Sequence, residues 1–180
     1  MTPVLRKLIA VATLLAILFV AGCGGGDPPP PGTPSAAEDL LSLAEVRQLP
    51  KGSPEQALLG WWMHVQYNDL TGYLDGLAAP LRRVREAEPK TKRDLVLVSG
   101  ESLRSKPKVL ELQRENGETT LYTRVETRQP VGASRFTTSS TPQAFTLVRE
   151  GGEWKIADDS YIIDHAGIIR EAIENARPRR

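Results

Sequence analysis

The side chains best able to do chemistry in this sequence gather between positions 61 and 73. His64 carries an imidazole, the side chain that enzymes use most often as a general acid or base. Two tryptophans stand beside it, and two tyrosines can offer hydroxyls to a ligand. Five residues therefore form a candidate pocket: Trp61, Trp62, His64, Tyr67 and Tyr73. Histidines and tyrosines that border a core are most often packing residues, so we assign no catalytic residue.

The other ionisable groups are explained by local structure. Asp69 is placed to cap a helix, and Asp158 and Asp159 precede a C-terminal helix whose positive N-terminus favours carboxylates. We expect Asp164 and His165 to cap that same helix. The predicted strands place aliphatic residues, Phe and Thr inward, and no Asp or Glu clearly among them.

Metal and cofactor sites are not expected. Two histidines about a hundred positions apart, with no thiol in the domain, do not make the ligand set of a zinc site. The glycines at 24–26 belong to a linker and lack the pattern of a phosphate-binding loop. We predict no cofactor and no bound metal.

The first 22 residues have the character of an export signal. Arg6 and Lys7 precede an apolar run from Leu8 to Ala21, which is shorter than the roughly 20 residues that a membrane-spanning helix needs. Cys23 follows this run and is the only cysteine of the protein, so it has no disulfide partner within the chain.

The segment Val20-Ala21-Gly22-Cys23 resembles the lipobox of bacterial lipoproteins. The resemblance implies cleavage after Gly22 and a diacyl (palmitate-type) lipid on the sulfur of Cys23. The protein would then be anchored on the exported side of the cell membrane or the outer membrane. The alternatives are an ordinary cleavable signal with an incidental cysteine, or an uncleaved helix.

The remaining chain divides into a tether and one domain. Residues 23–52 contain the run GGGDPPPPG, which indicates a partly stiff spacer, and a short helix within 37–48 that either packs on the domain or stays free. Residues 53–180 form the domain. Loss of residues 1–22 leaves 21 basic and 22 acidic residues, a net charge of −1, which argues against a nucleic-acid binder.

The pattern of the domain predicts an α+β fold. Ser53 begins a helix, Asn68-Asp69 begins a second that ends at Pro80, and the spacing of apolar residues from 162 to 176 predicts a third. Between the second and third helices we expect five strands: Leu95–Val98, Val109–Leu112, Thr119–Thr127, Gln143–Arg149 and Trp154–Ala157. The segment 131–141 is either a loop or a ragged extension of its neighbouring strands.

Helices followed by an antiparallel meander resemble the NTF2-like superfamily. The likeness rests on Ser53-Pro54-Glu55, Trp61-Trp62, Asn68-Asp69 and the segment 145–156, FTLVREGGEWKI. It implies a cone-like domain, with N-terminal helices packed on a curved sheet and Trp154 plugging the core at the sheet's edge. The C-terminal helix is an addition to that pattern. We expect it to cover part of the sheet; the alternatives are that it fills the mouth of the pocket or offers an apolar ridge to a partner.

Together these features predict a membrane-anchored envelope protein with a non-catalytic domain. Its partner would be an envelope protein or a small apolar ligand, and homodimerisation through the sheet is a further expectation. The alternative is an enzyme of the isomerase, dehydratase or hydrolase kind that uses a pocket around His64.

Overall fold

The computed structural model describes residues 40–131 and 135–176 of the chain. Predictions about residues 1–39, among them the export signal, Cys23 and most of the tether, lie outside the described residues. The elements are α2 Leu43–Gln48, α3 Pro54–Gln66, α4 Leu70–Asp75, α5 Ala79–Ala87, α6 Thr91–Ser102, β1 Ser105–Glu115, β2 Glu118–Val131, β3 Arg135–Glu150, β4 Glu153–Ile156 and α7 Ser160–Ala176.

Polar caps begin α3 and α4 where the sequence predicts them. The Ser53 hydroxyl accepts a hydrogen bond from the backbone N–H of Gln56 at 3.1 Å. Asp69 caps α4 in the same way, because its Oδ1 accepts from the N–H of Gly72 at 3.1 Å. Between the two helices Asn68 has φ 53°, a left-handed conformation that lets the chain turn sharply. The first helix and the capped second helix are confirmed.

The segment before α3 packs on the domain, which settles the choice that the sequence left open. Leu41 is 3% exposed and joins the core, and Val46 of α2 is also buried. The backbone N–H of Leu41 donates to Oε1 of the buried Gln66 at 2.9 Å. Residues 41–48 are therefore part of the folded unit.

The stretch from Pro80 to Ser102 forms two helices that the sequence did not predict. The strand expected at Leu95–Val98 is wrong, because these residues lie inside α6. Leu95 and Val98 stand three residues apart and are both buried, as on one face of a helix. A four-residue apolar run fits either element. Pro80, expected to end the second helix, lies in the first turn of α5, where its missing N–H costs nothing.

The four described strands form one antiparallel sheet in the order β1-β2-β3-β4, so each strand pairs with the next along the chain. β2 alternates as predicted: Leu121 and Val125 are buried, while Tyr122 and Arg124 face outward. The segment 131–141 is largely an extension of its neighbours, because the pairing continues to Val131 opposite Arg135.

A tight hairpin joins the last two strands. Gly151 and Gly152 have φ values of 59° and 88°, the left-handed pair that a two-residue hairpin turn requires. The turn aligns Arg149 with Trp154 across the ladder. The predicted hairpin is confirmed.

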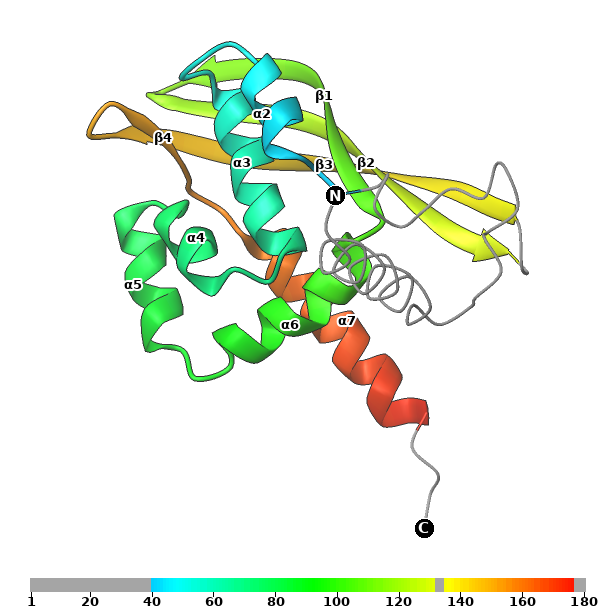
Figure 1. The fold of residues 1–180 in the computed structure, drawn as a ribbon. Coiled ribbons are helices and arrows are strands. Elements are labelled where there is room, and N and C mark those ends of the chain that lie inside the picture. Colours follow the sequence, from blue (N-terminus) through cyan, green and yellow to red (C-terminus); the bar gives the residue numbers. More distant parts are fainter. Residues whose placement is uncertain (1–39, 132–134, 177–180) are drawn as a thin grey trace, which may run out of the picture. The chain divides into compact units, whose positions relative to one another are not determined.

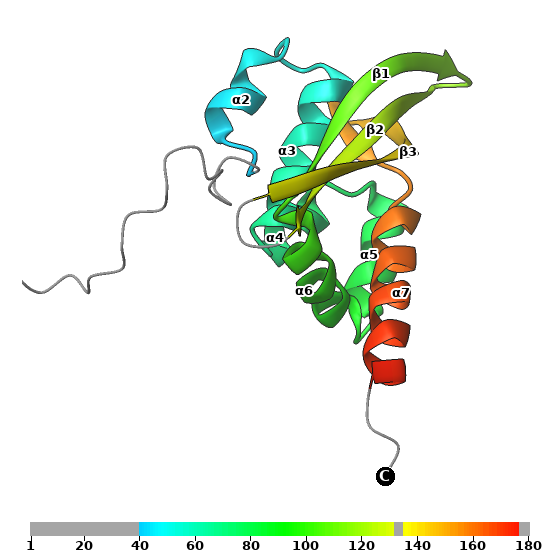
Figure 2. The same ribbon diagram turned by 90° about the vertical axis from the view of Figure 1, so that its right-hand side faces the viewer.

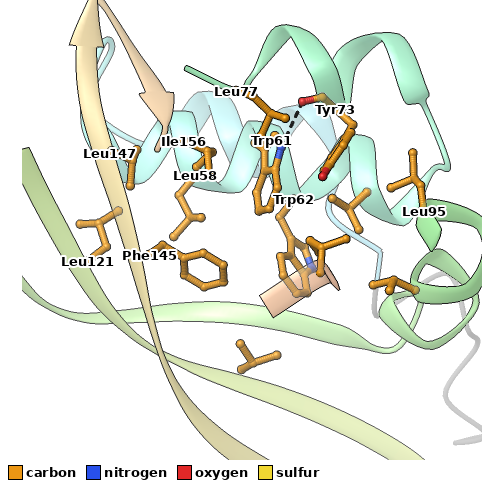
Figure 3. Close-up of a cluster of buried hydrophobic side chains, with 14 of the residues drawn as sticks. Leu58, Trp61, Trp62, Tyr73, Leu77, Leu95, Leu121, Phe145, Leu147 and Ile156 are labelled. Carbon is orange, nitrogen blue, oxygen red and sulfur yellow. Dashed lines mark hydrogen bonds between the residues drawn. The ribbon is translucent and has the colours of Figure 1, made fainter. Parts of the chain in front are cut away.

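The helices gather on one side of the sheet, with α3 directly against it (Figures 1 and 2). The core lies between them, and Figure 3 shows Leu58 and Trp62 of α3 facing Phe145 and Leu121 of the strands. The α+β class predicted from the sequence is therefore confirmed. None of the helices within the described ranges is long and apolar enough to cross a bilayer.

The C-terminal amphipathic helix is present as α7, with Ile162 and Ala166 buried. It packs mainly against α6. Its first turn reaches the sheet through Tyr161, whose ring centre lies 6.0 Å from that of Phe145. α7 therefore covers only a small part of the sheet, less than we expected. Ile168 on its outer face is 63% exposed.

Candidate functional site

Aromatic rings fill the space between α3 and the sheet. Trp61 and Trp62 meet Phe145 edge to face, with ring centres 6.2 and 6.1 Å apart. The indole N–H of Trp61 donates to the carbonyl oxygen of Tyr73 at 3.2 Å (Figure 3). These four side chains are at most 2% exposed. The place where a ligand pocket was expected is therefore a packed core.

The five residues of the candidate pocket lie in different environments. Trp62 and Tyr73 belong to the core. Tyr67 follows the last turn of α3 and is 56% exposed. Only Trp61 and His64 reach a common feature, a hollow on the outer surface of α3. The sequence placed Trp61, Trp62 and His64 on the first helix and Tyr73 on the second, as observed, but it did not reveal their different directions.

His64 is held against α4 by two neighbours. Its Nδ1 lies 2.8 Å from Oδ2 of Asp69. The ring rests on Gly72, where an added Cβ would come 2.1 Å from Nδ1. Asp69 acts as the predicted cap of α4, and the N–H of Gly72 and then the imidazole of His64 hold the pKa of its carboxyl below the usual value. The pair is half-exposed, at 37% for His64 and 46% for Asp69.

Two adjoining hollows run along α3 and β4. The first, of about 480 Å³, lies between α3, α4 and β4 and includes Trp61, His64, Gly72 and Gly76. The second, of about 470 Å³, lies between the start of α3 and the β3–β4 turn. Both are open to solvent, and both are lined by Ala57 and Trp154. We name the two hollows together the α3–β4 groove.

Trp154 lies between the two hollows and lines both of them. Its side chain is half-buried and packs on the edge of the core, while the guanidinium of Arg149 lies 5.5 Å from the ring centre. The prediction that Trp154 plugs the core is thus correct only for its inner part. Next to it, the ammonium of Lys155 donates to the carbonyl oxygen of Asp75 at 3.0 Å and pairs with Glu153 at 2.9 Å. The groove therefore combines aromatic surface, glycine backbone and paired charges.

The burial of two carboxylates was not predicted from the sequence, although Asp159 does precede the C-terminal helix as expected. Asp159 is 1% exposed and receives Nε and Nη2 of Arg85 at 2.8 and 2.7 Å. The hydroxyl of Tyr73 also donates to Asp159. Burial and the charge of Asp159 raise the pKa of Tyr73, and the hydrogen bond to Asp159 raises the pKa of Arg85. These contacts occupy the carboxylate, which serves to join helices and not to receive a ligand.

Asp94 of α6 is the second buried carboxylate. It is 1% exposed and forms an ion pair with Arg170 of α7. Its Oδ2 has no hydrogen-bond partner among the described residues. The sequence carries no signal for this residue, because an Asp in the first turn of a helix resembles an ordinary solvent-facing charge.

The expected capping by Asp164 and His165 is wrong, because both lie inside α7 beyond its first turn. Nε2 of His165 instead pairs with Glu101 of α6 at 2.9 Å, and its ring stacks on Tyr161 at 5.1 Å. Asp158 does act near the N-terminus of α7, since its Oδ1 accepts from the N–H of Ser160 at 2.8 Å. Within the described residues no three His, Cys, Asp or Glu side chains are grouped closely enough to hold a metal ion.

The chain shows little similarity to known proteins. No protein-family model matches the chain, and no curated protein matches it. Among solved structures, it is similar to a SEC-C motif containing protein from Rhodopseudomonas palustris, at 13% identity and a TM-score of 0.44, covering 62% of this chain and 80% of that one.

These findings correct the family resemblance drawn from the sequence. We expected a bacterial lipoprotein that carries an NTF2-like domain, but no family model of either kind matches the chain. What misled the prediction is that a helical start followed by a strand meander and a glycine hairpin is shared by unrelated α+β domains. The misassigned α6 made the pattern look richer in strands than it is.

Proposed function

We propose that this chain is a non-catalytic binding module of the cell envelope, held at a membrane through acyl chains on Cys23, and that its ligand occupies the α3–β4 groove. The observation that carries the proposal is the division of the molecule into a filled interior and an open groove. Trp61, Trp62 and Phe145 leave no room for a substrate between α3 and the sheet. The groove offers aromatic and polar groups to a ligand at the surface.

The chemistry of the groove favours binding over catalysis. An active site usually excludes water, so that its acids and bases act in a medium of low polarity. The His64–Asp69 pair is half-exposed and open to solvent. The buried carboxylates Asp94 and Asp159 are each held by an arginine.

The membrane location rests on the N-terminal residues alone. The basic start and the apolar run up to Ala21 suit export, and the lone Cys23 directly after them offers a thiol for acylation. Several acyl chains, each contributing about 0.8 kcal/mol per methylene, hold a protein firmly without a spanning helix. The residues from 24 to 39, rich in glycine and proline, would space the domain from the lipid.

Catalysis by His64, of the hydrolase, dehydratase or isomerase kind, is the second candidate. One observation favours it: a carboxylate of Asp69 holds Nδ1 of His64, as an orienting acid holds a general base. If it is right, His64→Ala abolishes turnover and leaves the melting temperature nearly unchanged. If the binding proposal is right, His64→Ala lowers affinity in the groove, and no turnover exists to be lost.

Site-specific photocrosslinking of the full chain in membranes of the native cell tests the binding proposal. A photoreactive residue at position 57, which lines both hollows, should capture a defined partner. The matched control is position 84 on α5, where Val84 is 57% exposed and lies outside the groove. Equal capture from both positions, or none from position 57, would contradict the proposal.

The anchor is tested separately by Cys23→Ser. The variant should leave the membrane fraction or remain unprocessed. Membrane association that needs detergent for release and is the same in the variant would refute acylation at Cys23.

A further inference from the structure

The outer edge of β4 carries main-chain groups that point away from β3. In an antiparallel ladder, residues alternate between those that hydrogen-bond to the neighbouring strand and those that point away from it. The two-residue turn aligns Glu150 with Glu153 and makes this the first hydrogen-bonded pair. By alternation, the N–H and C=O of Trp154 and of Ile156 point away from β3.

The contacts of Ile156 agree with this alternation. Its N–H donates to the carbonyl oxygen of Gly76 at 2.9 Å, and its carbonyl accepts from the N–H of Ala78 at 2.8 Å. Leu77 thereby forms an isolated parallel bridge with Ile156, in the place that a fifth strand would take beside β4. The position is filled here by the chain itself.

The same edge is unpaired one step earlier, at Trp154. The chain that would lie beside it is the last turn of α4, where the N–H of Gly76 is already bonded to the carbonyl oxygen of Gly72 within the helix. Among the described residues nothing donates to the carbonyl of Trp154 or accepts from its N–H on this side. The N–H and C=O of Trp154 therefore remain available for pairing with a further strand, at the residue that lines both hollows.

We propose that the ligand of the groove is an extended polypeptide segment that adds as a strand to β4 at Trp154; this rests on the proposed function. Exposed sheet edges bind extended peptides through main-chain hydrogen bonds, while pockets beside the edge take alternate side chains. The peptide would exchange hydrogen bonds with the N–H and C=O of Trp154. Its flanking side chains would enter the two hollows, of about 480 and 470 Å³.

Open hollows with main-chain groups between them suit a peptide better than a small apolar ligand. An apolar ligand gains most in an enclosed cavity that hides its surface. The α3–β4 groove is open to solvent, and polar side chains such as His64, Asp69 and Lys155 line it beside Trp154. A main chain needs the polar partners that such a groove provides.

The test begins with peptides selected from a random decapeptide phage library on the full-length chain in detergent. Selected peptides should bind at least about tenfold more weakly to Ala57→Phe, which fills the groove at the residue shared by both hollows. Ala57→Leu, a smaller filling, should reduce affinity by less, and equal melting temperatures show that both variants fold. If no selected peptide distinguishes the wild type from the variants, the proposal is overturned.

Backbone chemistry then separates strand addition from side-chain capture. N-methylation of each peptide residue in turn should weaken binding about tenfold or more at the residue that donates to the carbonyl of Trp154, and hardly at all at the residues beside it. Peptide binding should also slow hydrogen exchange of the Trp154 amide, while the Ile156 amide, already bonded to Gly76, stays unchanged. Indifference to N-methylation at every position overturns the proposal.

The outcomes for the two proposals are distinguishable. Crosslinks from position 57 together with peptides that tolerate N-methylation would keep the binding function and reject strand addition. Peptides with one methylation-sensitive residue, but without any cellular crosslink from position 57, would support the geometry of the edge and reject the proposed function.

Discussion

Arg85 holds Asp159 by two parallel hydrogen bonds, from Nε to Oδ2 at 2.8 Å and from Nη2 to Oδ1 at 2.7 Å. This contact joins α5 to the residue that precedes α7, and the hydroxyl of Tyr73 adds α4 to the same carboxylate. Paired, charge-assisted bonds of this kind are stronger than those between neutral groups. Asp159 is 1% exposed, so the hydrogen bonds to its carboxylate come from these partners.

Asp159→Asn should destabilise the domain strongly, because it leaves the largely buried guanidinium of Arg85 without its main counter-charge. Breaking one side of such a pair costs about 3 kcal/mol in the free energy of unfolding. Urea denaturation of the two proteins measures the loss. Asp158→Asn is the matched control, since this neighbour is exposed and an amide oxygen can still accept from Ser160. Similar losses in the two variants would contradict the role given to Asp159.

Stability should fall at alkaline pH through Tyr73. Burial first, and then the charge of Asp159, raise the pKa of the folded phenol above its ordinary value of 10.0. The stabilising contribution is fully present below about pH 10 and is lost as the pH rises, because the unfolded phenol ionises first. Denaturation between about pH 8 and pH 11 should show this decline, and Tyr73→Phe should reduce it. If the free energy of unfolding of Tyr73→Phe falls with pH as steeply as that of the wild type, the decline does not come from Tyr73.

The close contact between Gly72 and His64 should decide whether Gly72→Ala stabilises or destabilises the domain. Alanine is preferred over glycine in a helix by about 1 kcal/mol, but here its Cβ would meet Nδ1 of His64 at 2.1 Å. Gly72→Ala should therefore destabilise the wild type by about 1 kcal/mol and stabilise His64→Ala by about 0.5–1 kcal/mol.

Thermal unfolding of the four proteins measures this reversal. Gly100→Ala in α6 is the control, because nothing lies within 4 Å of its added Cβ. It should stabilise both backgrounds alike. The same sign for Gly72→Ala in both backgrounds would mean that His64 is not what restricts this position.

Arg170→Met should loosen α7 from α6. It leaves Asp94, 1% exposed and with Oδ2 already unpartnered, as a buried charge without a counter-ion. The expected cost is about 3 kcal/mol, and a second change, Asp94→Leu, should recover most of it. Hydrogen exchange of the α7 amides reports the loosening directly. Arg83→Met, on the exposed side of α5, is the control, and an equal effect there would remove the case for the pair.

Local features of the fold were predictable because their causes are local. Ser53 and Asp69 cap helices through neighbours three residues away, and Gly151 and Gly152 make a turn that only such residues adopt easily. The alternation around Tyr122 needs only the period of a strand. The same local signals misplaced Leu95–Val98, because a short apolar run suits a strand and a helix equally.

The candidate site was predicted only in part. His64 and Trp61 do line a surface hollow, but Trp62, which follows Trp61 directly, points into the core with Tyr73. Neighbours on a helix differ by about 100° in direction, so the face that each presents depends on where the sheet lies. The outer side of Trp154 and the free edge of β4 had no sequence signal, because both depend on where α4 approaches the sheet.

The sequence by itself determined the α+β class, the capped helices, the strand alternation and the final hairpin, since these follow from residue type and short-range spacing. Only the tertiary structure decided that Arg85 meets Asp159, that Asp94 meets Arg170, and that Trp154 stands between two hollows. Each of these contacts joins residues about 70 or more positions apart or depends on several elements at once. Burial of the shared apolar core brings such groups together, and nothing in their immediate neighbours along the chain specifies the partner.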